Sequence, residues 1–208
     1  GPRGAGRYRA GERRVNGAER VKAAKAGKAA GGSAAPSPGA SSGMPPGEAG
    51  PDFGAALDWR GRVPVSRRHG DGYWSLDGDG LAEARHVFLD GNDLAARMAG
   101  RRAFRIGETG FGTGLNLLAA WALWRERGAP GGVLSYVSVE AHPLTAAEMA
   151  QALGAWPELS AAAEALRGAW AAGGEGRRGD VRATLPGLAL EVRIGEAAAR
   201  LAGIAGVE

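Results

Sequence analysis

The sequence of 208 residues contains no cysteine, and its lysines are confined to one short stretch. Without cysteine, disulfide bridges and cysteine-based zinc sites are excluded. The three lysines, Lys22, Lys25 and Lys28, lie near the start of the chain, and the remainder uses arginine in their place. No apolar run is long enough for a membrane span or for the core of a secretory signal. We therefore expect a cytoplasmic protein that has no membrane partner.

Residues 1–51 lack the large apolar side chains that a folded core requires. They carry nine basic and three acidic side chains, whereas residues 52–208 carry seventeen and nineteen. Burial of so little apolar surface cannot offset the loss of chain entropy on folding, so we predict a disordered basic tail rich in Gly, Ala, Pro and Ser. Such a tail is either an arm that contacts nucleic acid or an extension without a role. The folded part is predicted to be residues 52–208.

What the chain has in abundance is glycine, and four glycines dominate residues 103–116. Phe104 to Ile106 is typical of the end of a short strand, and an apolar helix is predicted to begin at Leu115. Gly107, Gly110, Gly112 and Gly114 lie between the two. Glycine is needed where the backbone takes a positive φ or where a ligand lies against the main chain. Amides at the start of the helix would then point at whatever lies over this loop.

Three interpretations of the loop remain open on spacing alone. A dinucleotide-binding loop has the pattern G-x-G-x-x-G, which the glycines here match poorly. The sequence Glu108 to Gly114, Glu-x-Gly-x-Gly-x-Gly, is typical of methyltransferases that use S-adenosylmethionine. The third interpretation is a tight strand-to-helix turn that binds nothing.

The rest of the chain alternates between strand and helix patterns. We predict hairpins over residues 56–66 and 181–194, a strand over 133–139, and helices over 81–89, 115–127, 161–170 and after the capping-box sequence that begins at Thr145. Asp79 is placed to cap the helix at 81–89, in which Leu81, Ala84, Val87 and Phe88 should share one face. This order predicts an α/β sheet with right-handed crossovers.

Three carboxylates follow predicted strands: Glu108, Glu140 and Glu196. Ligands of open α/β sheets bind beyond the carboxyl ends of the strands. Glu140 is suited to accept hydrogen bonds from two ribose hydroxyls, Glu196 could meet an adenine edge, and Glu108 could approach an ammonium group. Each could instead be a solvated residue at a strand end. Asp77 and Asp79 lack the rest of a calcium-binding loop, so no metal is expected.

Several separate blocks together resemble one known family. These blocks are Pro64-Val65-Ser66, Asp71-x-Tyr73-x-Ser75, Gly80-Leu81-x-Glu83-x-Arg85-x-Val87-Phe88-Leu89-x-Gly91-Asn92, Gly107 to Asn116, and Glu140-x-x-Pro143-Leu144-Thr145. In this order they resemble the amino-terminal methyltransferase domain of the bifunctional tRNA 5-methylaminomethyl-2-thiouridine biosynthesis proteins, the MnmC family. The resemblance covers about residue 56 to the end of the chain.

The resemblance implies a Rossmann-like methyltransferase fold, incomplete, with the first three sheet strands plus an amino-terminal hairpin and helix. It implies S-adenosylmethionine as cofactor and tRNA as partner, the methyl group going to the 5-aminomethyl group of the wobble (2-thio)uridine. By position, the donor would be bound by Gly107, Glu108, Gly110, Gly112, Gly114, Glu140 and Glu196. Tyr73, Ser75 and Glu83 would lie near that pocket.

Two departures from the family pattern affect these expectations. Glu196 stands where the family usually has Asp. The segment expected to hold the acceptor amine would lie beyond Glu208, and the FAD-dependent oxidoreductase half is absent as well, so the catalytic residues stay unassigned. We therefore expect a fragment that is inactive alone, with an unknown oligomeric state. The alternatives are a methyltransferase of the same fold with another substrate, and a non-catalytic remnant.

Overall fold

A four-stranded sheet forms the centre of the structure, a computed structural model that describes residues 57–75, 78–173, 179–201 and 204. The tail predicted for residues 1–51 lies outside the described residues. The strands are β3 (Ala103–Thr109), β4 (Val133–Glu140), β5 (Val181–Leu185) and β6 (Leu188–Ile194), in the order β3-β4-β6-β5. β3, β4 and β6 are parallel, and β5 pairs antiparallel with β6. The predicted mixed α/β sheet is confirmed.

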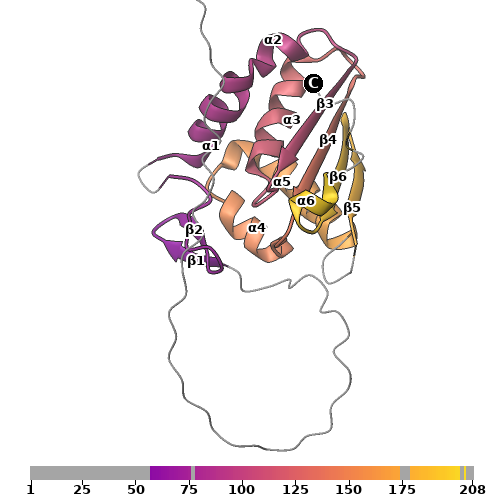
Figure 1. The fold of residues 1–208 in the computed structure, drawn as a ribbon. Helices are drawn as coiled ribbons and strands as arrows, with labels where there is room; N and C mark the ends of the chain where they lie inside the picture. Colours follow the sequence, from indigo (N-terminus) through magenta and orange to yellow (C-terminus); the bar gives the residue numbers. More distant parts are fainter. Residues whose placement is uncertain (1–56, 76–77, 174–178, 202–203, 205–208) are drawn as a thin grey trace, which may run out of the picture. The chain divides into compact units, whose positions relative to one another are not determined.

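The main helices cover one face of this sheet (Figure 1). They are α3 (Leu115–Arg127), α4 (Ala146–Leu153) and α5 (Ser160–Gly173), joined on the same side by α1 (Gly80–Glu83) and α2 (Leu94–Met98). Alternate strand residues such as Phe104, Tyr136 and Leu190 enter the core with them. Short helical turns complete the described chain: η1 (Ala84–Leu89), η2 (Asp90–Asn92), η3 (Pro157–Leu159) and α6 (Ala197–Arg200).

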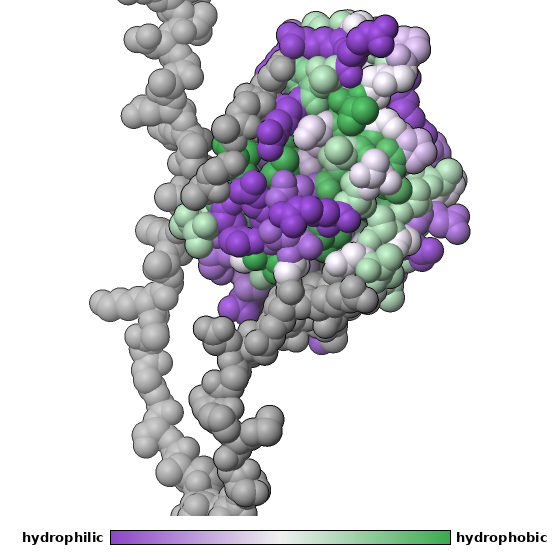
Figure 2. Space-filling model, turned by 90° about the vertical axis from the view of Figure 1, so that its right-hand side faces the viewer, coloured by the Kyte–Doolittle hydropathy of each residue, from purple (hydrophilic) through white to green (hydrophobic). Residues whose placement is uncertain are grey.

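The other sheet face carries the opposite set of strand residues and is more polar. Figure 2, which views the molecule from the side of β5 and β6, shows hydrophilic residues gathered in the middle of this face. Glu191 accepts from both Arg182 (2.9 Å) and Arg193 (3.2 Å), and Asp180 pairs with Arg200. Polar side chains thus take the place here of the apolar residues that a covering helix would need.

A separate hairpin precedes the sheet, as predicted. β1 (Leu57–Arg60) pairs antiparallel with β2 (Val63–Ser66), and the turn uses Gly61 at φ +62°. Leu57 and Val63 are buried in the same core as the helices, which fixes the hairpin to the domain.

The helix predicted over residues 81–89 differs from expectation in its second half. Asp79 caps α1 as predicted, since its side chain accepts from the Leu81 amide, but the chain then widens into the π-helical turn η1. A π-helix has more residues per turn than an α-helix. The inward position therefore falls on Leu89, while Val87, predicted to be inward, is 63% exposed. No helix among the described residues has the length and apolar character to cross a membrane.

Candidate functional site

The glycine loop after β3 takes the backbone conformation that its sequence predicts. Gly110, Gly112 and Gly114 have φ values of +84°, +54° and +79°. A Cβ at Gly112 would lie 3.0 Å from the Tyr73 ring, and one at Gly114 would lie 3.0 Å from Leu166, whereas a Cβ at Gly110 would meet nothing within 4 Å. Positive φ therefore explains all three glycines, and packing adds a second requirement at two of them. Gly107 lies within β3.

Glu140 binds this loop directly. The Gly112 amide donates to Oε2 of Glu140 (2.8 Å), and the His142 amide donates to Oε1 (2.7 Å). The loop and the end of β4 are thereby joined at the carboxyl edge of the sheet. Each carboxylate oxygen still has a lone pair for a further donor, because an ionised carboxylate accepts about four hydrogen bonds. The structure thus brings Glu140 to the loop, and its interaction with a ribose remains a prediction.

The opposite side of the loop rests on an aromatic stack. The Phe111 ring lies parallel to the Trp170 ring of α5, with centroids 5.1 Å apart and planes 8° from parallel. Trp170 is fully buried and donates its indole N–H to the Leu144 carbonyl (2.8 Å). Because both ends of the stack are fixed, the loop is held in position before any ligand binds.

Glu108 is the most perturbed carboxylate described. It accepts from Asn116 Nδ2 (3.1 Å) and Ser138 Oγ (2.9 Å). Desolvation raises the pKa of Glu108 to about 7, and the hydrogen bonds from Asn116 and Ser138 only partly oppose this. Burial also raises the pKa of Tyr136 well above its ordinary value, and the neighbouring Glu108 adds to the effect. A carboxyl group with a pKa near 7 is present in both its neutral and its charged form at neutral pH.

A cavity of about 370 Å³ opens in front of the glycine loop. The loop contributes Gly110, Phe111, Gly112 and Thr113, and the facing wall comes from α1, η1 and the segment before them. The full set of lining residues includes one carboxylate, Glu83, and no arginine or lysine: Tyr73, Trp74, Gly80, Glu83, Ala84, Val87, Phe88, Asn92, Gly110, Phe111, Gly112, Thr113, Leu115 and Asn116.

The three residues predicted near the pocket have different positions in it. Tyr73 and Glu83 line the cavity. Ser75 does not, but its amide donates to Glu83 Oε2 (2.8 Å) and so holds that carboxylate in place. Burial, with the charges of Glu140 and Glu148, raises the pKa of Tyr73 to about 12, which keeps its hydroxyl protonated as a donor.

Glu196 follows β6, whose end lies beside Glu140, because the Gly195 amide donates to the Glu140 carbonyl (2.8 Å). It is exposed, stands before α6, and its backbone carbonyl accepts from the Ala199 and Arg200 amides. Its side chain has no hydrogen bond among the described residues.

Asn116 and Ser138 were not singled out as site residues from the sequence, although they hold Glu108. A signal was present in both cases. Asn116 is a polar residue in the first turn of an apolar helix, and Ser138 lies between two valines of β4, Val137 and Val139. Buried polar groups of this kind require a partner, so each could have been assigned one in advance.

The fold belongs to the Rossmann-like methyltransferase class. The crystal structure of MnmC2 from Aquifex aeolicus superposes with a TM-score of 0.50 and 20% sequence identity, covering 68% of this chain and 42% of that chain. This similarity supports the fold.

The chain is similar in sequence to tRNA 5-methylaminomethyl-2-thiouridine biosynthesis bifunctional proteins MnmC, so the predicted resemblance is confirmed. The protein from Thiobacillus denitrificans is 51% identical over 116 residues, which are 56% of this chain and 19% of that protein. The protein from Caulobacter vibrioides is 48% identical over 140 residues, or 66% of this chain and 23% of that protein. The chain spans about a fifth of the length of these curated relatives. No family model matches the sequence.

Proposed function

We propose that this chain binds S-adenosylmethionine at the glycine loop and contributes to methylation of the 5-aminomethyl group of wobble (2-thio)uridine in tRNA. The observation that carries the proposal is the acidic cavity against the glycine loop, lined by Glu83 and by no arginine or lysine. A dinucleotide brings an anionic pyrophosphate, which such a site would repel. The methyl donor carries a sulfonium and an ammonium, both of which it would attract.

The residues fit the donor group by group. Glu140, the last residue of β4, would offer its remaining lone pairs to the ribose hydroxyls. Glu108, near the end of β3, would meet the ammonium group, and the positive φ values at Gly110 and Gly112 would let the donor lie against the main chain. Glu196, exposed at the end of β6 beside Glu140, would meet the adenine edge.

S-adenosylmethionine would supply an electrophilic methyl group on its sulfonium. The protein's contribution is to align the acceptor amine with that methyl and to remove water from around both. An amine attacks only in its neutral form, so a base must take its proton. Glu83 provides a carboxylate in the cavity, with Oε2 fixed by the Ser75 amide and Oε1 left for a proton.

Isothermal titration of the chain with S-adenosylmethionine, with NAD as control ligand, tests the donor site. Saturable binding of the methyl donor alone is expected, and Glu140→Ala should abolish it. Binding of NAD in preference, or of neither ligand by a folded chain, would contradict the proposal. A second step, methyl transfer to tRNA that carries 5-aminomethyluridine, then separates this acceptor from another substrate of the same fold.

A non-catalytic remnant is the competing function. The conformation of the glycine loop argues against complete loss of the donor site, because three positive φ values and the contact from Glu140 to Gly112 are retained.

A further inference from the structure

A second cavity, of about 460 Å³, lies on the other side of Trp74 from the donor cavity. Trp74 and Gly80 line both cavities, so the two share a wall. The second cavity is formed by the turn of the β1–β2 hairpin, the segment before α1, and the residues Ala155 and Trp156 after α4. Its lining differs sharply in charge from the first, because it contains Arg60 and Arg62.

Arg60 and Arg62 flank Gly61 at the tip of the hairpin, and both are exposed. Neither has a carboxylate partner among the residues that the structure describes. By contrast Arg67, at the open end of the same hairpin, pairs with Asp58 (2.8 Å). Two exposed guanidinium groups therefore line this cavity, and within the described part of the chain no carboxylate pairs with either.

The one carboxylate in this cavity is already satisfied. Asp79 Oδ1 accepts from the indole N–H of Trp156 (2.6 Å) and from the Leu81 amide (2.9 Å). The bond from Trp156 is the main reason that the pKa of Asp79 lies below its ordinary value. These donors are neutral, so Asp79 keeps its negative charge, and the lining carries two guanidinium groups, Arg60 and Arg62, against one carboxylate.

Two indole rings form the back wall. Trp74 and Trp156 meet edge to face, with ring centroids 5.1 Å apart, and each is less than 10% exposed. These mostly buried rings give the cavity an apolar side, and the exposed Arg60 and Arg62 give it two guanidinium groups that can bind a phosphate.

We propose that Arg60, Arg62 and this second cavity bind the phosphate backbone of the RNA substrate, next to the nucleotide whose base enters the donor cavity. The proposal rests on the proposed function for its choice of RNA. Trp74 and Gly80 line both cavities, so a single RNA strand that passes over them would reach both. The aminomethyl base would enter the acidic cavity, and the adjoining phosphate would bind in the basic one.

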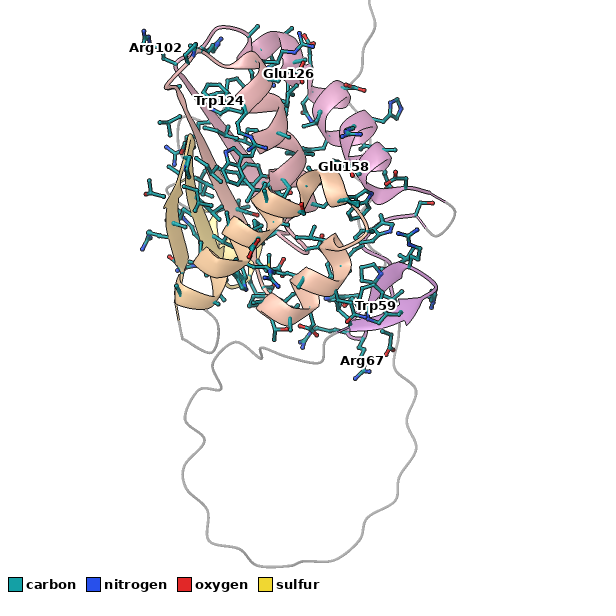
Figure 3. The ribbon with its side chains drawn as sticks, turned by 180° about the vertical axis from the view of Figure 1, so that it is seen from behind. Trp59, Arg67, Arg102, Trp124, Glu126 and Glu158 are labelled. Carbon is teal, nitrogen blue, oxygen red and sulfur yellow. The ribbon has the colours of Figure 1, made fainter. Side chains whose placement is uncertain are left out.

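The test compares two charge-matched double variants of the full chain. Arg60→Gln with Arg62→Gln removes the proposed contacts. Arg102→Gln with Arg125→Gln removes two exposed charges at the opposite end of the domain, where Figure 3 shows Arg102 far from the hairpin residue Arg67. Binding of a tRNA transcript is measured by fluorescence anisotropy over a series of salt concentrations, with S-adenosylmethionine binding measured in parallel.

Arg60→Gln with Arg62→Gln should weaken RNA binding about tenfold and make the plot of log K against log salt shallower by about one to two, since each lost phosphate contact lowers the slope by about one. The control pair should change binding less than threefold by the same reasoning. Equal losses in both pairs, or none in the first, would overturn the proposal. If Arg60→Gln with Arg62→Gln binds S-adenosylmethionine normally, a loss of RNA binding in this variant is not caused by damage to the donor site.

Discussion

At the residue scale, Gly110 allows the effect of backbone strain to be measured separately from the proposed contact with a ligand. A Cβ at Gly110 or at Gly61 meets no atom within 4 Å, and both residues have positive φ. Gly110→Ala and Gly61→Ala should therefore each destabilise the fold by about 1 kcal/mol through strain alone. Only Gly110→Ala should also weaken binding of S-adenosylmethionine, by tenfold or more, when measured by titration calorimetry. Equal donor affinity in the two variants would show that nothing lies against Gly110.

Glu108 gives the stability of the fold a defined pH dependence. Its pKa rises from 4.5 to about 7 on folding. Between these values the folded state holds a proton that the unfolded state has lost, so stability is highest below pH 4.5 and falls as pH rises through about 7. The full loss is on the order of 3 kcal/mol. In urea unfolding from pH 5 to pH 8, Glu108→Gln should remove this fall.

The matched control is Glu164→Gln, which changes an exposed carboxylate on α5. Its pH profile should follow that of the unmodified chain. If Glu108→Gln retained the same fall as the control, the titrating group would lie elsewhere.

At the scale of the elements, α4 depends on a reciprocal cap at its first turn. The Glu148 amide donates to Thr145 Oγ1 (3.1 Å), and the Thr145 amide donates to Glu148 Oε2 (2.9 Å). Thr145→Ala should cost about 1 kcal/mol in thermal or urea unfolding, whereas Thr145→Ser, which keeps the hydroxyl, should cost less. Serine lacks only the threonine methyl group, so an equal loss of stability in both variants would show that packing of this methyl group, and not the cap, stabilises α4.

The elements also explain why one helix prediction was partly wrong. Apolar spacing at Leu81, Ala84, Val87 and Phe88 assumes 3.6 residues per turn, but the π-turn η1 changes that period. The change directs Leu89 into the core and leaves Val87 and Phe88 at the cavity in front of the glycine loop. The π-helical turn η1, which the spacing of apolar residues did not predict, thus forms one wall of the candidate site.

At the scale of the whole molecule, β3 stands at the edge of the sheet. Within the described part of the chain, no strand pairs with its outer side, although β3 carries the glycine loop. Unpaired edges are available for pairing with other chains. We expect association of the 208-residue chain that rises with concentration in sedimentation velocity. A single monomeric species across the whole concentration range would contradict this expectation.

The sequence by itself determined the features that depend on neighbours along the chain. A positive φ requires glycine at positions 110, 112, 114 and 187. The cap at Thr145 depends on hydrogen bonds within the first turn of α4. The resemblance of separate blocks added the methyltransferase fold and the prediction that Tyr73 and Glu83 lie near the donor pocket. Both residues line the cavity in front of the glycine loop.

Only the tertiary structure decided the properties that arise between distant segments. The pKa of Glu108 is raised by desolvation in the folded chain and is opposed by hydrogen bonds from Asn116 and from Ser138, thirty residues away. The contact from Glu140 to Gly112 joins the end of β4 to the glycine loop. The contrast between an acidic and a basic cavity on either side of Trp74 likewise requires the hairpin to pack beside α1. Burial and charge at a site are sums over all the groups that surround it, and the order of residues in the chain does not list those groups.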